Sequence, residues 1–152
     1  MRVGLISDTH GLLRPEALDA LRGSEAIVHA GDVGDASILD QLGTIAPLTM
    51  VRGNIDRGPE AELWPDTAEL TVDGLRLFVL HDISALDLDP AAAGYAAVIF
   101  GHSHKPSIDR RGDVLFVNPG SAGPRRFRLP VTVAMLTVNG HELSAEHIGL
   151  LI

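Results

Sequence analysis

The stretch VIFGHSHKP, residues 98–106, holds an apolar run that ends in Gly101 and is followed at once by His102 and His104. Such a run is typical of a buried strand. Histidines two positions apart in an extended segment point to the same side of the chain. The pair therefore suits a metal ion, although ordinary hydrogen-bonding histidines at a strand end would have the same pattern.

Composition bounds what the chain can be. Its 152 residues, 45% hydrophobic and 21% charged, predict a single globular domain over residues 1–152 with a sizeable core. The net charge of -8 argues against general nucleic-acid binding, which needs a basic face. A small anionic substrate stays open, because bound cations can reverse the local charge.

Three features that the sequence lacks narrow the class of protein further. The sequence has no cysteine, so disulfides, thiolate metal sites and cysteine nucleophiles are excluded. No apolar stretch approaches the ~18 residues of a membrane helix. The apolar run at the N-terminus is too short for a signal peptide, since Asp8 interrupts it. We therefore expect a cytoplasmic protein without a membrane partner.

The first third of the chain alternates between strands and helices. We predict helices from Pro15 to Gly23 and from Asp35 to Gly43, with strands at residues 2–7, 26–30 and 48–51. Such alternation implies parallel strands joined by right-handed crossovers.

The second half is richer in strands. Asp73-Gly74 and Asn139-Gly140 are hairpin turn signals within residues 69–80 and 131–148. Further strands are expected at 97–100 and on both sides of Arg111-Gly112, and a short helix from Asp89-Pro90. The whole pattern favours an α/β fold, a four-layer α-β-β-α sandwich of two mixed β-sheets flanked by helices.

Polar side chains follow five of these strands. In open α/β sheets, ligands bind beyond the carboxyl ends of the strands. Buried charges without partners are costly, so carboxylates and imidazoles that converge there would need a metal ion. The candidate metal ligands are Asp8, His10, Asp32, Asn54, His81, His102 and His104.

Simpler interpretations stay open at several positions. Asp8 could cap a turn, and Asp35 could be only a helix cap. Asp56 could be a turn residue or a residue that supports the ligands. His29 lies inside a strand pattern and is expected to be a core or supporting histidine rather than a ligand.

The type of ligand indicates the type of metal. Mixed carboxylate, imidazole and amide ligands without sulfur suit Mn(II), Fe or Zn better than calcium or magnesium, with Co and Ni also open. Seven candidates are too many for one four-coordinate zinc. They suit two divalent transition metal ions that share one carboxylate.

The order of these residues resembles the calcineurin-like metallophosphoesterase superfamily. The corresponding segments are SDTHG, GDVGD, GNID, LHD and GHSHKP, and the later NPGSAGPRR resembles the small YfcE-like phosphodiesterase branch. The resemblance covers Met1 to Arg126. Each segment alone is weak, but five in order at strand ends are specific.

The resemblance implies roles for the residues. Asp8, His10 and His104 would bind one metal ion, Asn54, His81 and His102 the other, and Asp32 would bridge them. The implied reaction is in-line attack of a metal-bridging hydroxide on a small phosphate ester. Asn54 would also orient the phosphate, and Arg125 would help to hold the ester anion unless it is an ordinary surface residue.

Two departures from the family pattern qualify this expectation. Many relatives have a histidine where this chain has Ile55, and that histidine helps to protonate the leaving group. Small relatives often have H-G-H where this chain has His81-Asp82-Ile83. The alternatives are a non-catalytic metal-binding or interaction scaffold of the same fold, as in Vps29, and a phosphomonoesterase. The sequence leaves the substrate, the native metal and homo-oligomer formation open.

Overall fold

The computed structural model describes all residues, 1–152. Two short α-helices, two 3-10 helices and ten strands follow one another along the chain: β1 Arg2–Ile6, α1 Pro15–Leu21, β2 Ala26–His29, α2 Ser37–Gly43, β3 Leu48–Met50, η1 Ala61–Leu63, β4 Thr67–Val72, β5 Leu75–Leu80, η2 Ile83–Ala85, β6 Tyr95–Ile99, β7 Ser107–Arg111, β8 Val114–Asn118, β9 Thr132–Asn139 and β10 Glu142–Gly149. None of the helices has the length and hydropathy of a membrane span.

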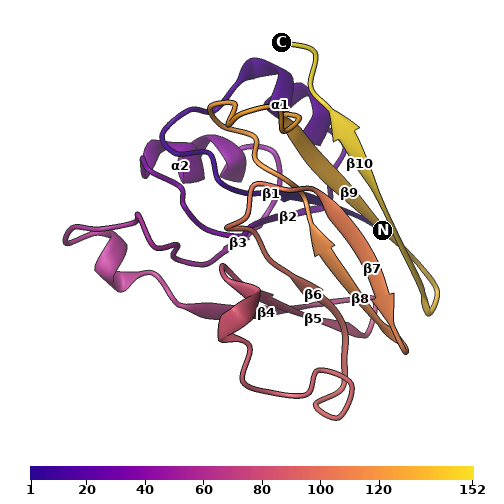
Figure 1. Cartoon of the computed structure of the whole chain (residues 1–152). Helices are drawn as coiled ribbons and strands as arrows, with labels where there is room; N and C mark the ends of the chain where they lie inside the picture. Colours follow the sequence, from indigo (N-terminus) through magenta and orange to yellow (C-terminus); the bar gives the residue numbers. More distant parts are fainter.

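The strands form two mixed sheets of five strands (Figure 1). In the first sheet, with the order β10-β9-β1-β2-β3, the strands β1, β2 and β3 are parallel. In the second, with the order β4-β5-β6-β8-β7, the strands β5, β6 and β8 are parallel. The predicted hairpins around Asp73-Gly74 and Asn139-Gly140 are present as β4–β5 and β9–β10.

Alternation along β1 shows how the layers are held together. Val3 and Leu5 belong to a core of 17 buried residues that both sheets share. Ile6 points the other way, into a core of 12 buried residues formed with α1 and α2. Successive strand residues face opposite sides of a sheet, so β1 contributes side chains to both cores. The predicted α/β sandwich is confirmed.

The outer face of the second sheet is covered differently from the first. Phe78, Val98 and Phe116 pack there against Ile83 of η2 and neighbouring loop residues. The helix expected from Asp89-Pro90 is wrong, because those residues form a turn that Gly94 ends with a φ of +87°. Only three residues separate Pro90 from that glycine, which leaves no room for a helix of two turns.

Candidate metal centre

The seven candidate ligands all follow the carboxyl ends of parallel strands. Asp8 and His10 follow β1, Asp32 follows β2, and the other ligands follow β3, β5 and β6. A hydrogen bond joins the loops of the two sheets at this edge: the His102 N–H donates to the side-chain Oδ2 of Asp8 at 3.1 Å. The fold therefore brings residues almost one hundred positions apart into one cluster.

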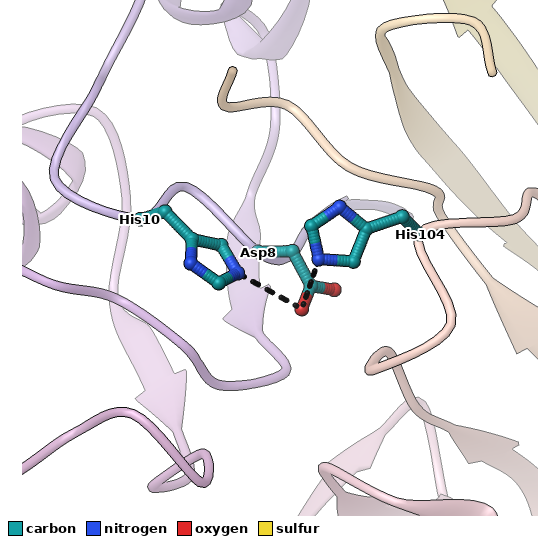
Figure 2. Close-up of side chains that lie close together, drawn as sticks. All are labelled: Asp8, His10 and His104. Atoms are coloured by element: carbon teal, nitrogen blue, oxygen red, sulfur yellow. Dashed lines mark ion pairs between the residues drawn. The ribbon is translucent and has the colours of Figure 1, made fainter. Parts of the chain in front are cut away.

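Asp8 presents one free carboxylate oxygen to three imidazoles. Its Oδ2 accepts hydrogen bonds from Ser7 Oγ at 2.7 Å and from the backbone of His102. Its Oδ1 is buried and has no hydrogen-bond donor. That oxygen lies 3.5 Å from His104 Nε2, 3.8 Å from His10 Nε2 and 3.9 Å from His81 Nε2. Figure 2 shows His10 and His104 converging on it.

Asp32 is arranged in the same way. Its Oδ1 accepts the Ile55 N–H at 3.0 Å, and its Oδ2 lies 3.4 Å from His10 Nε2 and 3.3 Å from His81 Nε2. Burial would raise the pKa of Asp32, but His81, the Ile55 N–H and His10 outweigh it and lower the pKa. The carboxylate is thus held ionised, with one oxygen between imidazoles from different sheets.

His81 and Asn54 complete the second half of the cluster. The His81 Nδ1–H donates to the Ala30 carbonyl at 2.7 Å, which turns Nε2 toward the carboxylates. Asn54 Oδ1 lies 3.1 Å from both His81 Nε2 and His102 Nδ1. Burial would lower the pKa of His81, but Asp32, the Ala30 carbonyl and Asp8 raise it overall.

The cluster fits divalent metal ions. Asp8 Oδ1 and His10 Nε2, which lie 3.8 Å apart, are buried atoms without hydrogen-bond partners, which is costly in a folded protein. Two ligand atoms that each lie about 2.1 Å from one ion are about 3.0–3.4 Å apart when the ligand–metal–ligand angle is about 90–110°. Two sets of side chains offer ligand atoms within 4.8 Å of one another, so small movements would let each set hold an ion: Asp8, His10 and His104, and Asp8, Asp32 and His81.

The backbone at these positions is strained. Left-handed φ values are uncommon for residues other than glycine, and each costs of order 1–3 kcal/mol. Five of the seven candidate ligands adopt them: Asp8, His10, Asp32, His102 and His104, with φ from 47° to 73°. Five of the seven non-glycine residues with such φ values are thus candidate ligands, and strain of this kind is typical of functional sites.

Two glycines let the chain approach the carboxylates closely. A Cβ added to Gly101 would lie 2.1 Å from Ser7 Oγ and 2.6 Å from Asp8 Oδ2. A Cβ on Gly53 would lie 2.1 Å from Asp32 Oδ1. Any larger residue would therefore displace an aspartate.

Four residues near the candidate ligands make structural contacts. His29 is fully buried, with Nε2 3.0 Å from Thr9 Oγ1, and burial lowers its pKa to about 4. It is a core histidine, as expected. Asp35 is exposed and accepts the Ser37 N–H, but the N-cap residue of α2 is Ala36, so Asp35 is a turn residue just before the helix. The supporting contacts of Ser7 and Thr9 were not foreseen, because a lone hydroxyl gives no sequence signal.

Asp56 holds two ligand loops together. Its carboxylate accepts the N–H groups of Val33, Gly34 and Gly53 at 2.8–3.2 Å. We expect Asp56→Ala to lower the free energy of unfolding by about 2–4 kcal/mol, since buried donors lose a charged acceptor. Urea unfolding of the metal-free protein measures this. Asp35→Ala, at an exposed aspartate with one backbone contact, is the control and should cost about 1 kcal/mol or less. Equal losses would contradict the role of Asp56.

A match to a family model decides the classification. The calcineurin-like phosphoesterase superfamily domain matches residues 1–141. The chain belongs to this superfamily. The probable metallophosphoesterase of Methanothermobacter thermautotrophicus is 36% identical over 158 residues, which cover 96% of this chain and 91% of that protein.

Two further comparisons lead to proteins of different kinds. The phosphodiesterase YfcE of Escherichia coli is 28% identical, over 90% of this chain and 87% of its own. The structure of Vps29 from Chaetomium thermophilum superposes with a TM-score of 0.79 at 20% identity, with 97% of each chain covered. The fold is therefore shared by this superfamily member and by Vps29, and it does not by itself establish catalysis.

The two departures from the superfamily pattern have clear positions in the structure. Ile55 is 39% exposed, so its side chain is not part of the core. Its contribution to the cluster comes from the backbone N–H on Asp32. Asp82 accepts hydrogen bonds from the backbone and hydroxyl of Ser84 and starts η2, with Oδ2 3.8 Å from His102 Nε2. Neither position places a second imidazole in the cluster.

Proposed function

We propose that the chain is a dinuclear metal-dependent phosphoesterase, and more narrowly a phosphodiesterase, that hydrolyses small phosphate esters. The position of Asp32 Oδ2, 3.4 Å from His10 and 3.3 Å from His81, is the observation that carries the proposal. One oxygen that faces ligands of both proposed sets is what a bridging carboxylate requires. The first ion would be held by Asp8, His10 and His104, and the second by Asn54, His81 and His102.

Two bound divalent ions would supply positive charge to the phosphate and lower the pKa of a water for in-line attack on phosphorus. Mn(II) is our first choice, with Fe, Zn, Co and Ni as alternatives. The chain's own residues orient the ester. Asn54 Oδ1 faces the imidazoles of His81 and His102, and the amide nitrogen of Asn54 has no hydrogen bond within the chain. That nitrogen is free to donate to a phosphate oxygen.

A cavity of about 640 Å³ lies beside the second ligand set and includes Asn54, His81 and His102 in its wall. Its size is that of a small-molecule site. Only Leu80 and Ala85 are hydrophobic among its lining residues. The cavity supports a small polar ester group as the part of the substrate held there.

A scaffold function of the Vps29 kind is the second candidate. Ile55 favours it, because an exposed isoleucine replaces the proton donor that the resemblance would place there. A panel of phosphodiesters and phosphomonoesters with Mn(II), Co(II) or Ni(II) separates the two candidates. Metal-dependent turnover of aryl phosphodiesters supports the enzyme. Metal binding without turnover of any ester would favour the scaffold.

Metal affinity should depend on pH. Histidine binds a metal only when neutral, and its ordinary pKa is about 6.5. The pKa of His81 is raised in the metal-free protein, so a proton competes with the metal at that nitrogen even near neutral pH. Affinity for Mn(II) should fall as the pH falls through this range. Calorimetric titrations at pH 5.5 and pH 8 test this, and equal affinities would contradict imidazole ligation.

A further inference from the structure

The loop between β8 and β9 carries an unusual concentration of positive charge. Its tip, Pro124–Leu129, has the sequence PRRFRL and is called the basic loop here. Three of the chain's 12 lysines and arginines lie in it, although the net charge of the chain is -8. Arg125, Arg126 and Arg128 form no ion pair, whereas other exposed arginines such as Arg22 and Arg111 do. The charge of the loop is therefore not neutralised within the chain.

The base of this loop is fixed to the candidate metal centre. Ser121 Oγ donates to the Asp8 carbonyl at 2.9 Å, and Arg14 Nη2 donates to the Gly123 carbonyl at 3.2 Å. At the tip, the Leu129 N–H donates to the Arg126 carbonyl at 3.1 Å and closes a turn. The basic loop is thus an anchored projection beside Asp8.

A hollow of about 170 Å³ connects the arginines to the metal centre. It is lined by His10 and His104 on one side and by Pro124, Arg125 and Arg126 on the other. The cavity of about 640 Å³ contains neither of these histidines and borders His81 and His102 instead. An ester phosphate at the centre would therefore have a polar cavity beside one ligand set and two arginines beside the other.

The basic loop also exposes an aromatic ring. Phe127 is 90% exposed and has a φ of 54°, so it gains little from burial and adopts a strained backbone. A single exposed apolar residue needs no explanation by itself. An exposed ring between arginines is different. Proteins that bind single-stranded nucleic acids hold the phosphates with positive charge and stack the bases on aromatic rings.

We propose that the basic loop recognises a nucleotide: Arg125 and Arg126 bind a second phosphate of the substrate, and Phe127 stacks on its base. This inference rests on the proposed phosphodiesterase function and narrows its substrate to nucleotide phosphodiesters with an additional phosphate. The basic loop is a short cluster of three arginines in a chain with a net charge of -8, so a short nucleotide fits better than a nucleic-acid polymer.

A matched pair of substrates tests the proposal. Thymidine 5′-(p-nitrophenyl phosphate) and the same compound with a 3′-phosphate release the same nitrophenolate and differ only in the second phosphate. With the Mn(II)-loaded protein, the 3′-phosphate should lower KM about tenfold or more, as expected for charge-assisted hydrogen bonds. The double variant Arg125→Ala/Arg126→Ala should lose this difference. Arg22→Ala, at the far end of α1, is the control for changed net charge and should keep it.

Phe127→Ala tests the base contact. It should raise KM for both thymidine substrates more than for methyl p-nitrophenyl phosphate, which has no base. Circular dichroism confirms that each variant is folded. Equal KM values for the matched pair in the wild type, or a difference that survives in the double variant, would overturn the proposal while leaving a phosphodiesterase in place.

Binding distinguishes failure of the loop from failure of the proposed function. If no ester is hydrolysed, nucleotide binding by the basic loop can still be tested. Calorimetry measures the affinity of the metal-free protein for thymidine 3′,5′-bisphosphate and for thymidine 5′-monophosphate. Tighter binding of the bisphosphate that depends on Arg125 and Arg126 supports the loop. Equal binding overturns it.

Discussion

Asp32→Ala should remove both of the metal ions that we expect each wild-type chain to bind. Asp32 Oδ2 faces His10 and His81 at 3.4 and 3.3 Å, so its loss takes a ligand from both proposed sets. Mutating residues that only orient ligands typically costs 10–100-fold in metal affinity or activity. Loss of a shared ligand should exceed this, and we expect more than a 100-fold loss of phosphodiesterase activity.

Elemental analysis after gel filtration measures the metal content directly. Asp32→Asn keeps an oxygen for the Ile55 N–H and tests whether the charge itself is needed. Asp35→Ala removes a nearby exposed carboxylate and should leave two ions bound. A wild-type protein that takes up no metal with Mn(II) present, or an Asp32→Ala protein that retains both ions, would refute the shared site.

The leaving group should control the rate because of Ile55. Protonation of a leaving group typically contributes about 10²–10⁴-fold to a rate. Ile55 cannot donate a proton, and Asp82, at the second departure from the family resemblance, accepts hydrogen bonds from Ser84. A nitrophenolate leaves without such help, whereas an alkoxide does not. We therefore expect aryl phosphodiesters to be turned over faster than alkyl phosphodiesters, by a factor of about 10² or more.

Ile55→His tests the explanation. The Ile55 side chain is partly exposed at the edge of the cluster, so an imidazole can be accommodated there. The variant should raise activity on alkyl leaving groups and on phenolate more than on p-nitrophenolate. Methyl phenyl phosphate and methyl p-nitrophenyl phosphate form a suitable pair. Equal changes for both would mean that a different group, or a water, supplies the proton.

Much of the fold could be predicted because it depends on local patterns. Alternating apolar residues and turn glycines placed all ten strands and both α-helices close to their observed positions. The strand ends then identified which polar residues would meet, since parallel strands direct their carboxyl ends to one edge. The helix expected from Asp89-Pro90 was wrong because a start signal does not reveal that Gly94 ends the turn.

Other features depend on contacts that no local pattern contains. The Asp8 and Asp32 carboxylates each use one oxygen for hydrogen bonds and leave the other toward imidazoles, which requires both sheets to be in place. The hollow beside Arg125 lies between His10, His104 and a loop that Ser121 ties to Asp8, so it depends on residues far apart in the sequence. The roles of the individual ligands, the single domain over residues 1–152 and the cytoplasmic location stay predictions.

The left-handed backbone at five candidate ligands sets the stability of the fold against the metal binding that we propose. At about 1–3 kcal/mol each, these conformations offset a substantial part of the 5–15 kcal/mol that keeps a typical domain folded. Glycine adopts the same conformation without strain. Engineering this protein for heat resistance alone would therefore favour glycine at the half-exposed His102, and that substitution would remove one of the proposed metal ligands.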